Sequence, residues 1–394
     1  MRNKIVLITG STETLEYFSL QLKKGFEALG YQTFLFDMAD EEASAERLAH
    51  FAGFSDTLLV TFNFDGIHYE TALFDGEGRL FWDVRDIPCI NIAVDHPFFY
   101  PELFALRPKR FCQVCIDRLH QQYIMRFHPE VENSFFLPLA GTSLSPKGDY
   151  LPITERKYDV VFAANFAPKE DFDCHIMRSG EEYEAFYRSI IDELLRHPER
   201  PDDEVMEEYL LREFPDATDR ELGETIANMI FIDTYIRSYF REKAVQLLVD
   251  AGVRVHCIGH GWERLTCRHP ENLTFEPNTD SHTCLLRLAE AKISLNAMPW
   301  FKDGAHDRVF NAMANGSVCL TDGSRYLREI LSDGENVVFY DLGQIEKLPE
   351  LALTLLAQPG KMQQIAHQGF ALAMAGHTWE HRAATLHQEL LKGY

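Results

Sequence analysis

The sequence lacks any long apolar run. No stretch of about 18 consecutive apolar residues, the length that a membrane-spanning helix requires, occurs along the chain. The apolar run at residues 5–8 leads at once into a Gly-Ser turn, which is typical of a strand and not of a secretory signal peptide. We therefore expect no integral membrane segment and a cytoplasmic location.

Positive charge is also scarce, with 38 Lys and Arg against 61 Asp and Glu and a formal net charge of −23. A nucleic-acid partner needs Lys and Arg to displace counterions from phosphates, so this class of partner is excluded. An anionic membrane surface is disfavoured for the same reason. A few cations lining one cleft remain compatible with an acidic total, which leaves a single nucleotide diphosphate as a suitable ligand.

Motifs for metals and dinucleotides are missing. Cys112 and Cys115 have the Cys-x-x-Cys spacing, but the other cysteines are scattered and no second pair or close His pair completes a zinc site. No Asp-x-Asp motif stands in a clear strand-end context, and the turn at 10–12 lacks the Gly-x-Gly-x-x-Gly spacing. We therefore expect no metal and no dinucleotide cofactor.

The sequence does contain a repeated alternation of short apolar runs and amphipathic stretches, which is typical of βαβ units with buried parallel strands. In the first part of the chain, strands are expected at 5–9, 33–37, 57–62, 89–94, 111–116 and 134–139. A turn-rich linker follows at 141–156. Beyond it, strands are expected at 158–166, 253–259, 272–276, 292–296, 317–322 and 336–340.

This pattern predicts an α/β protein built from two Rossmann-like domains. The first is expected at 1–150, and the second at 156–375 with a helical insertion at about 169–248. A last helix at 376–394 is expected to brace the first domain. Ligands of such sheets bind beyond the carboxyl ends of the strands, so site residues are sought in the loops that follow strands.

One such loop follows the strand at 292–296 and opens a short helix that ends at Gly316. Free N–H groups at a helix N-terminus favour an anion, and Arg308 can add bidentate contacts to phosphate oxygens. A surface ion pair of Arg308 with a neighbouring aspartate is the alternative, and the local pattern leaves both open. The loop carries Lys302, Asp303, Gly304, His306 and Asp307.

Residues 308–322, together with 326–329 and 334–340, resemble the donor-binding half of the group-1 GT-B glycosyltransferases, in particular the spore-maturation CgeB-like branch. The resemblance continues more faintly at 158–166 and 258–262. It implies two Rossmann-like domains with parallel sheets facing each other across a cleft. It also implies transfer of a sugar from a nucleotide diphosphate sugar to a hydroxyl or amide acceptor, and the sugar is expected to be a hexose.

In that group two glutamates with Glu-x7-Glu spacing contact the donor, and the matching positions here hold Asp303 and Asn311. Asp303 keeps a carboxylate and is a catalytic candidate, whereas Asn311 loses a charge but can still bond hydroxyls. Catalysis without a metal is implied, because cationic side chains and helix amides would neutralise the leaving diphosphate. The donor-binding candidates are Arg308, Asn311, Lys302, Gly304, His306, His260 and Glu329, with Gly10 and Ser11 expected opposite the donor phosphates.

The turn at 259–262, which contains His260, has two interpretations. Its glycines can let a ligand approach the backbone while Trp262 covers a base or sugar ring. The alternative is a tight turn with a packing tryptophan.

Asp95 and His96 end a buried strand, and either is a candidate general base for an inverting transfer. The alternative is that Asp95 caps the next turn and His96 is a buried core histidine. The group-1 resemblance favours retention and a base at this position favours inversion, so the stereochemistry stays open.

The expected co-substrate is a UDP-sugar, and the expected acceptor is a glycan or a protein such as flagellin. Two alternatives stay open: a GT-B-fold sugar-nucleotide epimerase, and a non-catalytic binding or assembly protein whose donor site has decayed, as the substitution at Asn311 suggests. The sequence leaves the oligomeric state open.

Overall fold

The computed structural model describes residues 2–54, 56–178 and 180–391. The chain forms two compact units. The first unit comprises residues 1–140 and 377–394, and the second unit comprises residues 141–376. The domain bounds expected from the sequence, 1–150, 156–375 and 376–394, stay predictions. No helix within the described ranges combines the length and the apolar character needed to cross a membrane.

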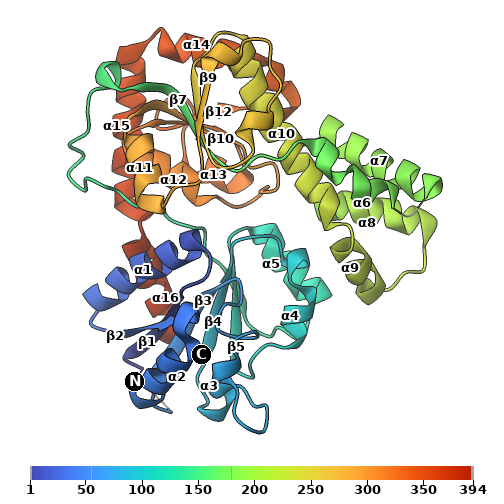
Figure 1. Ribbon diagram of the computed structural model, residues 1–394, viewed down its shortest axis with the longest axis vertical. Helices are drawn as coiled ribbons and strands as arrows, with labels where there is room; N and C mark the ends of the chain where they lie inside the picture. Colours follow the sequence, from blue (N-terminus) through green and yellow to red (C-terminus); the bar gives the residue numbers. More distant parts are fainter. Residues whose placement is uncertain (1, 55, 179, 392–394) are drawn as a thin grey trace. The chain divides into compact units, whose positions relative to one another are not determined.

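The first unit is built around a six-stranded parallel sheet with the strand order β2-β1-β3-β4-β5-β6 (Figure 1). Its apolar runs are strands because both faces of the sheet are covered; all six residues of β3, for example, are buried. The strands are β1 (Lys4–Thr9), β2 (Gln32–Asp37), β3 (Thr57–Phe62), β4 (Cys89–Ala93), β5 (Phe111–Cys115) and β6 (Ser134–Phe136). The helices are α1 (Glu13–Ala28), α2 (Glu41–Phe51), α3 (Phe81–Val84), α4 (Pro101–Ala105), α5 (Arg118–Phe127) and α16 (Trp379–Leu391).

Strand β6 is shorter than expected. It ends at Phe136 and not at Leu139, although the Leu137 N–H still donates to the Cys115 carbonyl at 2.9 Å. Pro138 follows, and because proline has no N–H to offer a neighbouring strand, pairing stops there.

The second unit contains another six-stranded parallel sheet, with the order β12-β11-β10-β7-β8-β9. Numbered within the unit, this is the order 3-2-1-4-5-6 read from the β9 edge, which is the Rossmann order. The strands are β7 (Tyr158–Ala163), β8 (Val255–Ile258), β9 (Leu273–Glu276), β10 (Ala291–Asn296), β11 (Val318–Asp322) and β12 (Val338–Tyr340). Around them lie α11 (Ser281–Ala289), α12 (Asp307–Ala314), α13 (Arg325–Ile330), α14 (Leu348–Leu356) and α15 (Pro359–Gly376).

The helical insertion is confirmed and forms the connection from β7 to β8. Its helices are α6 (Asp173–Met177), α7 (Glu181–Arg196), α8 (Asp202–Glu213), α9 (Asp219–Ala227) and α10 (Ile230–Asp250). Helices α6 to α9 group together to one side of the sheet, and α10 leads back to it (Figure 1).

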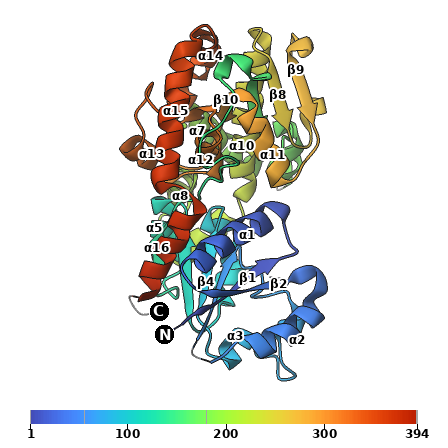
Figure 2. The same cartoon turned by 90° about the vertical axis from the view of Figure 1, so that its left-hand side faces the viewer.

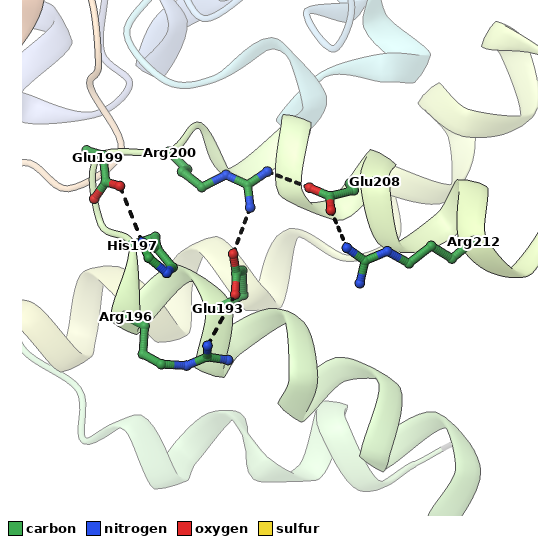
Figure 3. Close-up of polar contacts among 7 residues, drawn as sticks. All are labelled: Glu193, Arg196, His197, Glu199, Arg200, Glu208 and Arg212. Atoms are coloured by element: carbon green, nitrogen blue, oxygen red, sulfur yellow. Dashed lines mark hydrogen bonds and ion pairs between the residues drawn. The ribbon is translucent and has the colours of Figure 1, made fainter.

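An ion-pair network fixes the corner between α7 and α8 (Figure 3). Arg200 bridges the two helices, with Nη1 2.8 Å from Glu193 Oε1 and Nη2 2.5 Å from Glu208 Oε2. Arg212 pairs with the same Glu208. Such exposed pairs each contribute less than about 1 kcal/mol, so the network orients this corner more than it stabilises the unit.

Helix α16 packs beside α1 in the first unit, as Figure 2 shows. The Trp379 ring lies 4.8 Å from the Phe18 ring, and the buried Arg382 guanidinium donates to the carbonyls of Pro138 (2.7 Å) and Leu139 (3.0 Å). His377, just before this helix, accepts a hydrogen bond at its Nδ1 from Nη2 of Arg382, at 3.1 Å. Burial, and secondly Arg382, lower the pKa of His377 from 6.5 to about 4.

We expect the first unit to lose stability as the pH falls from 6.5 towards 4. Between these pH values His377 is protonated in the unfolded chain and neutral in the folded protein. The free energy of unfolding therefore rises with pH. Allowing for the partial exposure of the ring, the loss is about 1–2 kcal/mol. Urea unfolding of the wild type and of His377→Gln at pH 7 and pH 4.5 measures it. An equal pH dependence in both proteins would contradict the assignment.

Candidate functional site

The strand order of the second unit reverses between β7 and β10, and this is the point at which open α/β sheets bind ligands. Arg308, in the first turn of α12, contacts the ends of both strands that flank this reversal. Its Nη1 donates to the carbonyl oxygen of Ala163, the last residue of β7, at 3.1 Å. Its Nη2 donates to the carbonyl of Ala297, directly after β10, at 3.5 Å. The guanidinium therefore joins the ends of the two strands that flank the reversal.

Helix α12 begins at this position because His306 adopts an extended backbone as its N-cap and Asp307 occupies the first turn. The Nδ1 atom of His306 lies 2.5 Å from Asp307 Oδ1. Burial lowers the pKa of His306. Burial alone would raise the pKa of Asp307, but His306 and Arg308 outweigh it and hold this pKa below its ordinary value. Asp307 is therefore a carboxylate that orients His306 beside Arg308.

Three arginines gather around the Trp300 ring in the loop after β10. The guanidinium carbons of Arg237, Arg241 and Arg308 lie 4.2, 5.3 and 5.9 Å from its ring centroid. Arg237 and Arg241 come from α10, one turn apart, and Arg241 also donates to the Asn165 carbonyl beyond β7 at 2.9 Å. We call Arg237, Arg241 and Arg308 the arginine cluster.

The arginine cluster is an unusual concentration of positive charge in an acidic chain. Asp233 pairs with Arg237 at 2.7 Å, and the Asp307 carboxylate pairs with His306. The Nε atom of Arg308 is buried and has no hydrogen-bond partner among the described residues. Burial lowers the pKa of Arg308, because a desolvated guanidinium is less stable. A bound anion would relieve both the mutual repulsion and the unmet hydrogen bond.

Asn311 lies on α12, where its amide is engaged within the second unit. Its side-chain oxygen Oδ1 accepts from the Thr142 N–H at 2.9 Å, and its side-chain Nδ2 donates to Asp307 Oδ2 at 2.8 Å. Asn311 therefore ties the segment after residue 141 to the carboxylate that orients His306. Its role in binding hydroxyls of the donor stays a prediction.

Lys302 is held by backbone carbonyl groups. Its Nζ donates to the carbonyls of Pro198, at 2.7 Å, and of Pro299, so it links the corner between α7 and α8 to the loop after β10. It also lines a cavity of about 390 Å³ at the ends of β11 and β12, together with Asp322, Ser324, Arg325 and Arg328. Burial raises the pKa of Asp322 to about 6.

The remaining donor-site candidates of this unit are placed as follows. Asp303 is buried, and the carbonyl of Gly304 accepts from Ser324 Oγ at 2.6 Å. Glu329 is exposed on α13. His260 is exposed after β8, and its N–H donates to Asn165 Oδ1 at 3.0 Å. Their roles stay predictions.

The turn at 259–262 is a packing turn, and the interpretation of Trp262 as a ligand cover is wrong. Trp262 is 0% exposed, stacks on Phe166 at 4.9 Å and donates to the Ala164 carbonyl at 2.7 Å. Gly261 has a φ of 88°, and a Cβ there would overlap the Phe166 carbonyl oxygen. The turn is therefore packed closely against the protein's own loop after β7.

In the first unit, Gly10 and Ser11 directly follow β1 and are exposed. Gly10 has a φ of 81°, and a Cβ there would overlap the Asp37 carboxylate. Asp95 is half-buried and its Oδ2 lies 3.5 Å from the Tyr100 hydroxyl. His96 is 5% exposed, and its Nδ1 accepts from the Phe98 N–H at 3.2 Å. The catalytic roles of Asp95 and His96 stay predictions.

Cys112 and Cys115 both lie on β5 and are buried. Residues three apart on a strand point to opposite faces, so the two thiols cannot hold one metal ion. In the described parts of the chain, no group of three or more His, Cys, Asp or Glu side chains is placed to hold a metal.

The sequence analysis missed Arg237 and Arg241. The only signal was their spacing of four residues on one helix, which puts both on the same face, in a segment otherwise rich in acidic residues. The sequence does not reveal that this face contacts Trp300, because the two meet only where α10 returns to the sheet (Figure 1).

Comparisons with known proteins agree with this architecture. Sucrose-phosphate synthase from Thermosynechococcus elongatus is similar over 99% of both chains, with 12% identity and a TM-score of 0.53. A glycosyltransferase from Rickettsia africae is similar over 100% of both chains, with 8% identity and a TM-score of 0.55. Anabaena HepE, in a complex with UDP-glucose, is similar over 99% of both chains, with 11% identity and a TM-score of 0.53.

At these identities the structural likeness shows the fold. No curated protein matches the sequence. Residues 237–388, which include all three members of the arginine cluster, match the family model described as glycosyl transferase-like. The segment that resembles group-1 enzymes lies within this match. The chain therefore has the two-domain GT-B fold, and its residues 237–388 are similar to the glycosyl transferase-like family.

Proposed function

We propose that this protein transfers a hexose from a UDP-sugar to a hydroxyl or amide acceptor on a glycan or a protein, without a metal ion. The observation that carries the proposal is the arginine cluster at the strand-order reversal of the second unit. Three guanidiniums at the position where this class of sheet binds ligands suit a diphosphate better than any neutral ligand.

The chemistry of transfer explains why such a cluster is useful. When the bond between the sugar and the diphosphate breaks, negative charge develops on the leaving oxygen. Fixed cations in a partly desolvated site stabilise that charge without reorganising. Arg308 donates to strand-end carbonyls and is backed by Asp307, so its position is set before any ligand arrives. In the proposed reaction the arginines supply the positive charge that a divalent metal ion supplies in a metal-dependent transfer.

The nucleotide is proposed to be uridine diphosphate because Anabaena HepE, which has the same fold, binds UDP-glucose. The acceptor is proposed from the reaction class alone: any nucleophilic hydroxyl or amide on a cytoplasmic glycan or protein is compatible with it.

Calorimetric titration with UDP, GDP, dTDP and CMP, in chelator and then with magnesium, tests the proposal. We expect UDP to bind without metal, and Arg241→Ala to weaken this binding by about tenfold, since one charge-assisted hydrogen bond contributes about 1.5–3 kcal/mol. Arg220→Ala is the matched control, because Arg220 is an exposed arginine of the same unit on α9. Absence of binding by every nucleotide would refute the proposal.

A further inference from the structure

The cavity of about 390 Å³ at the carboxyl ends of β11 and β12 lies entirely within the second unit. Its volume is near the lower end of the range of about 300–1,000 Å³ that ligand pockets occupy. Its walls come from the loop after β10, from α13 and from the corner between α7 and α8, and no member of the arginine cluster lines it. The cavity is therefore a candidate site for a small ligand in addition to the arginine cluster.

Two arginines line this cavity without an ion pair. Arg325 and Arg328 are exposed and lie one turn apart on α13. No carboxylate of the described residues lies within ion-pair distance of either guanidinium, although Glu204 on α8 attracts Arg325 from farther away. A phosphate can bridge two such arginines, because each guanidinium offers a fork of N–H donors that matches two phosphate oxygens.

The Arg328 guanidinium is held in place before any ligand arrives. Its central carbon lies 4.6 Å from the centroid of the Phe339 ring. It also lies against the backbone of Gly323, where a Cβ would come within 2.8 Å of it. The glycine at this position therefore leaves room for the arginine side chain. Because the guanidinium is already oriented, it loses little conformational entropy when it binds an anion.

Carboxylates line the same cavity beside the arginines. Asp322 is 5% exposed, and its Oδ1 accepts from the Met298 N–H at 2.9 Å. Asp341 Oδ1 accepts from the Gly343 N–H at 2.8 Å. Glu199 contributes a third carboxylate from the corner between α7 and α8 (Figure 3). Each carboxylate has lone pairs for further hydrogen bonds, so these groups favour a ligand that carries hydroxyl donors as well as an anion.

The walls of the cavity are tied to one another by hydrogen bonds. Lys302 Nζ donates to the Pro198 carbonyl at 2.7 Å, and the Arg325 N–H donates to the Lys302 carbonyl at 2.8 Å. These two bonds join the insertion, the loop after β10 and α13 around the same space. The ion pairs of Arg200 hold the corner that carries Pro198 (Figure 3). The site is therefore largely formed in advance, as small-molecule sites usually are.

We propose that this cavity binds the monophosphate of a sugar, with Arg325 and Arg328 on the phosphate and with Asp322 and Asp341 accepting from the sugar hydroxyls. The inference goes beyond the proposed transferase function and does not depend on it, because these four residues lie outside the arginine cluster.

Calorimetric titration of the full chain with glucose 1-phosphate, glucose 6-phosphate and ribose 5-phosphate tests the inference. Inorganic phosphate and glucose serve as the two halves of the ligand, and we expect at least one sugar phosphate to bind more tightly than either half. Arg325→Gln and Arg328→Gln should each weaken this binding by about tenfold, since each removes charge-assisted hydrogen bonds. Gly323→Ala should weaken it as well, because the added Cβ displaces the Arg328 guanidinium but keeps its charge.

Asp322→Asn separates recognition of the sugar from recognition of the phosphate. Asparagine keeps an acceptor for the Met298 N–H but loses the negative charge. The sugar phosphate should then lose about fivefold in affinity relative to inorganic phosphate, because a hydroxyl bonds a carboxylate more strongly than an amide. Arg220→Gln is the matched control for the arginine variants, because Arg220 is an exposed arginine on α9, and it should leave both affinities unchanged.

Saturating UDP or UDP-glucose should leave the sugar phosphate bound. Complete displacement by either, or unchanged affinity in both arginine variants, would place the ligand elsewhere and overturn the inference. Absence of binding by all three sugar phosphates would overturn it too, as would inorganic phosphate that binds as tightly as all of them. Failure of the wild type to bind UDP would instead count against the transferase function and leave this site unaffected.

Discussion

Arg308→Ala is expected to weaken UDP binding by roughly a hundredfold. Arg308 is the member of the arginine cluster that spans the ends of β7 and β10, and its Nε is a buried donor that no described residue accepts from. Two charge-assisted hydrogen bonds to a diphosphate contribute about 3 kcal/mol or more, and about 1.4 kcal/mol corresponds to a factor of ten. Calorimetric titration of both proteins in chelator gives the ratio directly.

Arg308→Lys separates charge from geometry. Lysine keeps the positive charge but cannot form a bidentate contact, so we expect an affinity between those of the wild type and Arg308→Ala. Thermal unfolding without ligand checks that neither variant has lost its fold, since Arg308 also bonds two backbone carbonyls. If UDP bound equally to all three proteins, Arg308 would have no part in donor binding. A non-catalytic protein with a decayed donor site would then be favoured.

The strands of both sheets were predictable because each is a short apolar run bounded by turn residues, and parallel strands are buried on both faces. The β7-to-β8 insertion was predictable as helix for a related reason: its long acid-rich stretch contains no such run. The end of β6 was not, because the effect of Pro138 on pairing depends on which neighbour needs its N–H.

The candidate site was only partly predictable. Arg308 could be found because the strand, loop and helix that hold it are contiguous in sequence. Arg237 could not, because it acquires its partner through the fold: it meets Trp300 only after the insertion returns to the sheet. Local sequence carries no information on such pairings.

Gly261→Ala is expected to destabilise the second unit by about 2–5 kcal/mol, which combines a left-handed backbone penalty with steric overlap. Gly261 has a φ of 88°, and an alanine Cβ would overlap the Phe166 carbonyl oxygen. The loop cannot move aside easily, because Phe166 stacks on the fully buried Trp262 and its N–H donates to the His260 carbonyl at 2.9 Å.

Gly252→Ala is the matched control because Gly252 has nearly the same φ, 87°, but a Cβ there meets nothing within 4 Å. It should cost only the backbone penalty, about 1 kcal/mol. The difference between the urea midpoints of the two variants therefore isolates the overlap with the loop after β7. Equal midpoints would show that this loop yields to a methyl group. The close packing of Gly261 would then not restrict the position of the turn at 259–262, and this turn would be able to move towards a ligand.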